Sequence, residues 1–369
     1  MNKYSKSKSD GKLCSNDSMM YVGMDLHKNY LQIAVMDEKG KVIRNSKIDN
    51  DIQKIGTFFD QIKNNKNKND DDIKNYYNHH QKIVMESSCV WYNIYEYLSE
   101  ERNLDVILSN PIKTRAIASA KIKTDKIDAV KLAGLLRGGY ISECYVPNKK
   151  IMELRELVRH RIALVRMRTR LKNKIHGIML MKGMRINNNS TARFTIEYIN
   201  KLKELNDYRI NAYLHLIDSF DYEIKQVSKQ IAVYAKEDDT AKLLMTIPGI
   251  GYYSALLLIS EIGNIDRFCD SNHLCSYAGL IPSTHSSGGV TYHGPIIKTG
   301  SKYLRWIMVE CVRSHIRTQP NSNITKFYNK LVKKKGSAKA TVAASSKLLK
   351  IVYWVMKEKR EYRNDDNKQ

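Results

Sequence analysis

A short apolar run that ends on a carboxylate, residues 20–25, most constrains how this chain can fold. A second apolar run at 30–36 follows at once, and a third stretch at 41–48 comes after Lys39-Gly40. Runs of this length separated by a glycine-bearing turn predict three strands connected as a meander. An aspartate at the tip of a buried strand, here Asp25, is costly unless a cation lies against it. The run therefore predicts both a sheet and a charged site at its edge.

Further strands and helices alternate after the meander. Apolar residues at helical spacing predict a helix over 51–63, and a buried strand at 82–87 precedes a second helix over 91–98. Another strand at 105–109 is stopped by Asn110-Pro111. Strands that alternate with helices after an antiparallel meander predict a mixed α/β sheet. A change of composition at Pro147 marks the end of this domain, which therefore spans residues 19–147.

Three more acidic residues stand at the edges of predicted elements. Glu86 ends a strand, and Asp125 and Asp128 fall on one face in the first turn of a helix that begins at Thr124. For the helical pair alone the helix dipole is an alternative explanation, since it favours such acids by about 0.3–1 kcal/mol. Taken with Asp25, all four are predicted to be catalytic and to bind Mg²⁺, because paired magnesium ions need several carboxylates in one cleft.

Composition favours a nucleic-acid partner. The 369 residues can form two or three domains, and a net charge of +24 with a pI near 9.6 is typical of proteins that bind a polyanion. No apolar run reaches the ~18 residues that a membrane span needs. Residues 1–18 lack the apolar core of a signal peptide and are predicted to be a disordered arm. Scattered cysteines are typical of reduced thiols, so we expect the protein in the bacterial cytoplasm, with the nucleoid.

Residues 148–238 are predicted to form long helices with a seven-residue repeat of apolar residues. The repeat predicts a coiled-coil hairpin or an oligomerisation stalk. Its first helix is strongly basic, and this basic cluster is interpreted as a nucleic-acid track, with a solvated face as the alternative for any one residue. The residues assigned to the track are Arg155, Arg159, Arg166, Arg170 and Lys174.

The remaining chain, 239–362, is predicted to be a mostly helical domain with a polar tail at 363–369. In residues 243–257, two predicted apolar helices flank the sequence Pro-Gly-Ile-Gly, which is the pattern of a helix-hairpin-helix. In this motif Gly249 and Gly251 are predicted to bind a phosphate of the nucleic acid. An ordinary helical hairpin in a core is the alternative. Residues 330–362 are predicted to be a further basic helical segment.

A Ser/Gly-rich stretch at 279–289 is predicted to be a loop between helices. Three cations follow it, Lys298, Lys302 and Arg305, and they are assigned to nucleic-acid binding. A hydroxyl in a loop with cations nearby suits attack on phosphorus, although most loops of this composition carry no chemistry.

In this order and spacing the motifs resemble one family. They are Gly-Met-Asp25-Leu-His-Lys, Met-Glu86-Ser-Ser, Lys-Thr-Asp125-Lys-Ile-Asp128-Ala, Ile-Pro-Gly-Ile-Gly, Tyr-Ala-Gly-Leu-Ile-Pro, Ser-Ser287-Gly-Gly and Lys298-Thr-Gly-Ser-Lys-Tyr-Leu-Arg305. The chain resembles insertion-sequence transposases with a RuvC-like DEDD domain and a serine-bearing domain, a group that includes the pilin-gene invertases. The sequence departs from the family's usual motif at 292–295, where a proline follows the glycine.

The resemblance implies an RNase H-like N-terminal fold whose four acids, Asp25, Glu86, Asp125 and Asp128, bind Mg²⁺. It implies that Ser287, which directly follows Ser286, attacks DNA to form a 5′-phosphoserine intermediate. It also implies guidance by a structured non-coding RNA that pairs with donor and target DNA. Dimers paired into tetramers are implied as well, with the acids and the serine contributed by different subunits.

Two other function classes fit the residues. One is a magnesium-dependent, junction-resolving nuclease in which water attacks and the serine loop only binds DNA. The other is a non-catalytic nucleic-acid-binding protein, against which the intact set of four acids argues.

The net charge makes a prediction of its own. Because each neutralised phosphate releases counterions, the logarithm of the DNA association constant should fall linearly with the logarithm of salt concentration, with a slope of about −0.9 per phosphate. Fluorescence anisotropy with a labelled duplex over a salt series measures that slope. An affinity that hardly changes between low and moderate salt contradicts the prediction that the protein neutralises several DNA phosphates.

Overall fold

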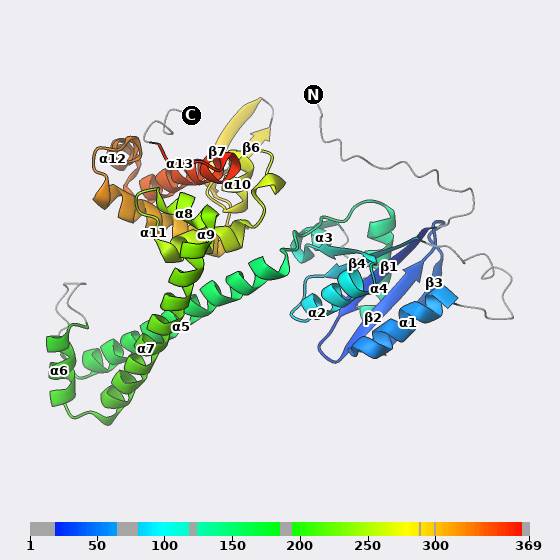
Figure 1. Ribbon diagram of the computed structural model, residues 1–369, viewed down its shortest axis with the longest axis horizontal. Helices are drawn as coiled ribbons and strands as arrows, with labels where there is room; N and C mark the ends of the chain where they lie inside the picture. Colours follow the sequence, from blue (N-terminus) through cyan, green and yellow to red (C-terminus); the bar gives the residue numbers. More distant parts are fainter. Residues whose placement is uncertain are drawn as a thin grey trace. The chain divides into compact units, whose positions relative to one another are not determined.

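The computed structural model describes residues 19–64, 80–117, 124–184, 194–287, 289–298 and 300–363 (Figure 1). The predicted arm at 1–18, and the predicted tail beyond residue 363, lie outside these residues. The chain divides into two compact units, Met1–Val146 and Pro147–Gln369.

A five-stranded sheet forms the first unit, in the order β3-β2-β1-β4-β5. The pairs β1–β2 and β2–β3 are antiparallel, and β1–β4 and β4–β5 are parallel. This confirms the predicted meander and the predicted mixed α/β sheet. The strands are β1 (Met19–Leu26), β2 (Tyr30–Met36), β3 (Val42–Asp49), β4 (His80–Glu86) and β5 (Asp105–Ser109).

The two faces of the sheet are covered by different helices. Successive residues of β1 point to opposite faces, so Val22 and Met24 pack with Phe58 and Phe59 of α1, whereas Tyr21 packs with Leu132 of α4. The helices of this unit are α1 (Ile52–Asn64), α2 (Trp91–Glu96) with the π-helical turn η1 (Tyr97–Glu101), α3 (Pro111–Ile117) and α4 (Asp125–Arg137).

Gly23 sets how closely α4 lies on the sheet. A Cβ atom at this position would be 2.2 Å from the carbonyl oxygen of Ala129 and 2.5 Å from the amide nitrogen of Ala133. Only a residue without a side chain therefore fits between β1 and α4 at this point. Because Asp25 lies two residues further along the same strand, this packing brings it to the N-terminal turn of α4.

The second unit begins with two long helices, α5 (Lys149–Met181) and α7 (Tyr208–Glu237), separated by α6 (Ile196–Glu204). They run antiparallel, since Arg161 Nε donates to Ser228 Oγ at 2.8 Å and Arg168 forms an ion pair with Asp221 (Figure 1). The heptad pattern drifts at the end of α7, where Ala235 is buried and Tyr234 is 49% exposed. A straight helix has 3.6 rather than 3.5 residues per turn, which explains the shift; the coiled coil stays a prediction.

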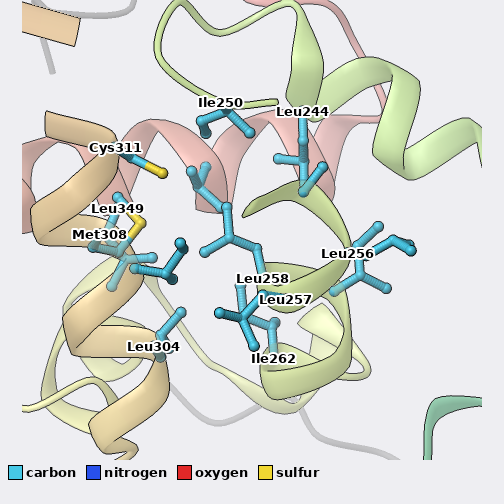
Figure 2. Packing of buried hydrophobic residues seen from close by; sticks show 14 of the residues in the cluster. Leu244, Ile250, Leu256, Leu257, Leu258, Ile262, Leu304, Met308, Cys311 and Leu349 are labelled. Atoms are coloured by element: carbon cyan, nitrogen blue, oxygen red, sulfur yellow. The ribbon is translucent and has the colours of Figure 1, made fainter. Parts of the chain in front are cut away.

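Helix α9 (Tyr252–Ile262) is the centre of the second unit. Every residue from Ser254 to Ile262 is buried, and Figure 2 shows its leucines among side chains of the surrounding helices. The other helical elements of this unit are α8 (Asp239–Met245), η2 (Ile265–Arg267), α10 (Ser271–Tyr277), α11 (Lys302–Thr318), α12 (Asn323–Lys335) and α13 (Ser337–Glu358).

The two glycines predicted to hold a phosphate both have roles inside the fold. Gly249 has a φ of +96°, and a Cβ there would lie 2.7 Å from Cys311 O and 2.7 Å from His315 N of α11. The Gly251 N–H donates to Ser254 Oγ at 2.8 Å within a cap of α9. This N–H is thus not the free donor that the motif predicts, and the helix-hairpin-helix stays a prediction.

The two glycines predict a matched pair of substitutions. Gly249→Ala should destabilise the protein by at least the ~1–3 kcal/mol of a strained backbone, because the methyl group also meets α11. Gly251→Ala should change the melting temperature little, since nothing lies within 4 Å of a Cβ there. Thermal unfolding followed by circular dichroism measures both. Equal melting temperatures for the two variants contradict the close approach of α11.

Candidate functional site

Three polar side chains meet at the edge of the sheet where β1 ends. One ligand atom from each of Asp25, His27 and Asp125 lies within 4.8 Å of the other two. His27 Nε2 is 3.2 Å from Asp25 Oδ2 and 3.5 Å from Asp125 Oδ1. Residues one hundred positions apart in the sequence are therefore brought into one cluster.

Local structure explains this meeting. Asp25 lies near the end of β1, and His27 follows in the turn to β2, where its N–H donates to Tyr30 O at 3.0 Å. Asp125 is the first residue of α4, whose N-cap Thr124 accepts a hydrogen bond from the Ile127 N–H. The Tyr30 hydroxyl donates to Asp125 Oδ2 at 2.8 Å and so fixes this carboxylate toward the strand end.

The surroundings of Asp25 disfavour its negative charge. Burial raises the pKa of the Asp25 carboxyl above its ordinary value, while His27 acts in the opposite direction. The neighbouring carboxylates of Asp125 and Asp128 raise this pKa further. A cation placed among these oxygens would relieve both the desolvation and the repulsion.

The other two predicted acids occupy the same edge but lie outside the tight cluster. Asp128 lies one turn along α4, and Lys131 Nζ is 3.1 Å from its Oδ1. Glu86 is the last residue of β4, and the strand register pairs Met24 with Met85, immediately before Asp25 and Glu86. Glu86 is therefore at the same level of the sheet as Asp25, and the four-acid site stays a prediction.

The donor set fits a divalent cation. Carboxylate oxygens from Asp25 and Asp125 are hard ligands of the kind that Mg²⁺ and Mn²⁺ prefer. The imidazole of His27 is a softer ligand that Mn²⁺ accepts more readily than Mg²⁺. Sequence reasoning missed both His27 and Tyr30, although the alternation of strand residues could have drawn attention to His27, two positions after Asp25.

The serine-bearing segment is a hairpin and not the predicted irregular loop. Strands β6 (Pro282–Ser287) and β7 (Val290–Ile296) pair antiparallel, with Ser287 opposite Val290. Gly289, with a φ of +79°, lies between them. A Gly-Gly pair between two short β-prone runs is a hairpin signal that the interpretation as a loop overlooked. The backbone thus places Ser287 beside the tip of this hairpin.

A buried carboxylate holds the segment that follows the hairpin. Glu261 of α9 has a side chain only 2% exposed, and it pairs with Arg159 of α5 through contacts of 2.8 Å and 3.1 Å. Ser301, the N-cap of α11, donates to Glu261 Oε2 at 2.9 Å. Sequence reasoning missed Glu261, because nothing local in the apolar run of α9 marks a charged residue as functional.

The cations assigned to nucleic-acid binding divide into two groups. Arg155 donates to the Ser260 carbonyl at 2.7 Å and 2.9 Å, Arg159 pairs with Glu261, and Arg305 donates to Ala278 O at 3.3 Å. These three are therefore engaged within the fold; Arg155 satisfies a carbonyl in the last turn of α9 that has no helical partner. The side chains that remain exposed are those of Arg166, Arg170, Lys174, Lys298 and Lys302.

The crowding of carboxylates predicts that Asp25 lowers the stability of the metal-free protein and is needed to bind a metal ion. In EDTA, Asp25→Asn should raise the melting temperature, because it removes a desolvated charge beside two other carboxylates. Adding Mn²⁺ should stabilise the unsubstituted protein by about 2.7 kcal/mol at one hundred times Kd, and the variant much less. Differential scanning fluorimetry measures both effects. Asp105→Asn, an exposed acid at the start of β5, is the control, and a lower melting temperature of Asp25→Asn in EDTA contradicts this electrostatic account.

Two family models match separate parts of the chain. Residues 22–182 match the model of the DEDD-type transposases of the IS110 group, and residues 241–329 match the model described as transposase IS116/IS110/IS902 family. Together the two models cover more than half of the chain. In the part that the structure describes, no helix is long and apolar enough to cross a bilayer.

Individual relatives are named as insertion-sequence transposases or as a pilin gene-inverting protein. The chain is 23% identical over 353 residues to the transposase for insertion sequence element IS1111A of Coxiella burnetii, covering 93% of this chain and 91% of that one. It is 27% identical to the transposase for insertion sequence element IS1328 of Yersinia enterocolitica, over 54% of this chain and 61% of the relative. It is 26% identical to the pilin gene-inverting protein of Moraxella bovis, over 76% of this chain and 81% of the relative. The chain belongs to the IS110/IS116/IS902 family of insertion-sequence transposases.

Proposed function

We propose that the protein cuts and rejoins DNA through a covalent serine intermediate, with Ser287 as the nucleophile and the acids of the first unit as ligands of a divalent metal. One observation carries the proposal: Asp25 and Asp125, from a strand end and a helix start, lie together in a chain of the transposase family. Structural acids at helix N-termini need no such partner from a strand.

The proposed step conserves the phosphodiester energy. The Ser287 hydroxyl oxygen forms a bond to phosphorus while the bond from phosphorus to the 3′ oxygen breaks. The serine proton passes to a base, and the departing 3′ oxygen takes up a proton to become a free hydroxyl. The phosphate stays on the serine as a 5′-phosphoserine, so the reverse attack by a 3′ hydroxyl joins strands without ATP.

The protein's own groups have separate tasks in this scheme. Asp25 and Asp125 hold the metal, with Asp128 and Glu86 as further ligands, and Tyr30 orients Asp125. When bound, Mg²⁺ or Mn²⁺ supplies positive charge that stabilises the transferring phosphoryl group and promotes loss of the nucleophile's proton. Glu261 and Arg159 fix the N-terminus of α11, which follows the serine hairpin.

We extend the proposal to partners. Arg166, Arg170 and Lys174 follow one another at helical spacing on α5 and are exposed, which suits a track along a phosphate backbone. Two partners are proposed for the protein, the DNA to be recombined and a structured non-coding RNA. Subunits are proposed to associate as dimers and tetramers, with the acids of one subunit acting on the serine of another.

A trapped adduct tests the nucleophile. With a nicked substrate carrying the element end, the unsubstituted protein should form an adduct that withstands denaturing electrophoresis. Ser287→Ala should abolish it, while Ser286→Ala, the neighbouring hydroxyl, should retain it. If only Ser286→Ala loses the adduct, the nucleophile is Ser286 and not Ser287. Persistent cleavage by Ser287→Ala, with none by Asp25→Ala, replaces the proposal by a nuclease that uses water.

The same assay decides which subunit supplies each group. Asp25→Ala and Ser287→Ala proteins should each be inactive alone and should recover adduct formation when mixed, if acids and serine come from different subunits. If the mixture forms no adduct, the acids and the serine that act together belong to the same subunit.

A further inference from the structure

A long segment of the second unit is basic without any acidic residue. Between Glu310 and Glu358 the sequence has no aspartate or glutamate. The segment contains eleven cations, Arg313, Arg317, Lys326, Lys330, Lys333, Lys334, Lys335, Lys339, Lys347, Lys350 and Lys357. Most extend into solvent: the first eight are all exposed. This concentration exceeds what solubility requires and indicates a polyanionic partner.

The segment contributes most of the lining of an open groove of about 840 Å³ between α11, α12 and α13. Its volume falls in the range of roughly 300–1,000 Å³ that ligand sites occupy. Two cations, Arg313 and Arg317, contribute to the lining from successive turns of α11. Arg313 is paired with Glu310 at 3.0 Å, and Arg317 is exposed. Glu310 lines the groove as well, so the two arginines and this glutamate give the lining a small net positive charge.

The rest of the lining includes apolar and aromatic residues. Ile316 of α11, Tyr328 of α12 and Val342 of α13 line the groove. The Tyr328 hydroxyl lies 3.2 Å from Ser337 Oγ, at the first turn of α13. This bond joins the two helices and fixes the ring. A fixed aromatic face beside guanidinium groups is the arrangement on which an unstacked base and its phosphate bind.

We propose that this groove binds an unpaired nucleotide of single-stranded DNA, with the base against Tyr328 and its phosphate at Arg317. In a duplex the bases are stacked and paired, so only an unpaired base can enter the groove. Glu310 adds an acceptor for the amino groups of a base. The choice of DNA rests on the proposed function, because cutting and rejoining exposes unpaired strands. Neither Ser287 nor the acids of the first unit take part in this binding.

Binding to the full-length protein in EDTA tests the groove. Labelled single-stranded and duplex DNA of the same sequence are titrated by fluorescence anisotropy. Tyr328→Ala should weaken single-strand binding about 5- to 150-fold, the effect of losing one stacked base, and leave duplex binding within about twofold. Arg317→Ala should lower the single-strand salt slope by about 0.7. Matched controls on α7 are Tyr222→Ala and Lys229→Ala, which should leave both affinities within about twofold of the unsubstituted protein.

Photo-crosslinking keeps the test valid if Tyr328→Ala unfolds, since Tyr328 also packs against the core. A 5-iododeoxyuridine oligonucleotide should crosslink to the peptide that contains Tyr328 in the unsubstituted protein, as identified by mass spectrometry. Tyr328→Phe keeps the ring but loses the hydrogen bond to Ser337, so it should keep most of the affinity that Tyr328→Ala loses.

Three results would overturn the proposal: crosslinks only outside the groove, equal loss of duplex and single-strand binding in Tyr328→Ala, or no loss of either. Tighter, Tyr328-dependent binding of an RNA oligonucleotide would overturn the assignment to DNA. Because these measurements need neither metal nor the serine, a failure here leaves the adduct assay intact, and a failure of that assay leaves these measurements intact.

Discussion

The contact between Gly23 and the backbone of α4 is the constraint on which the site in the first unit depends. A helix normally stands off a sheet by the thickness of the side chains between them. Here a bare α-carbon lets the backbone at Ala129 and Ala133 approach β1 directly. The N-terminal turn of α4, with Asp125, is thereby lowered to the level of Asp25. The electrostatic conflict at Asp25 is thus a consequence of packing, since a more distant helix would leave this carboxylate with fewer charged neighbours.

In the second unit an ion pair on the buried carboxylate of Glu261 has the corresponding role. Glu261 is desolvated at the end of an apolar helix, and an unpaired carboxylate there would be strongly destabilising. Arg159 and Ser301 together neutralise it and satisfy its oxygens. These contacts join α5, α9 and the start of α11, so the long hairpin helices and the helix after the serine strands share one anchor.

The sequence predicted the features that depend on local pattern. Alternation and turn residues were sufficient for the meander and the mixed sheet, and the strand ends located Asp25 and Glu86. The roles of Gly249 and Arg155 inside the fold depend on contacts with α11 and α9, which no local pattern encodes, and binding of a phosphate by these residues stays a prediction. His27 was missed because its importance arises only when Asp125, distant in sequence, is placed beside it.

The acid-free stretch from Cys311 to Lys357 has a consequence for how its charge responds to solution conditions. Its one histidine, His315, is buried, which lowers the pKa of its ring, and burial raises the pKa of the Cys311 thiol to about 12. Lysine and arginine keep their protons well above neutrality. From roughly pH 7 to pH 9 the stretch therefore carries a constant charge. Its electrostatic attraction then responds to ionic strength and hardly to acidity, so it acts as a fixed polycation and not as a sensor of protons.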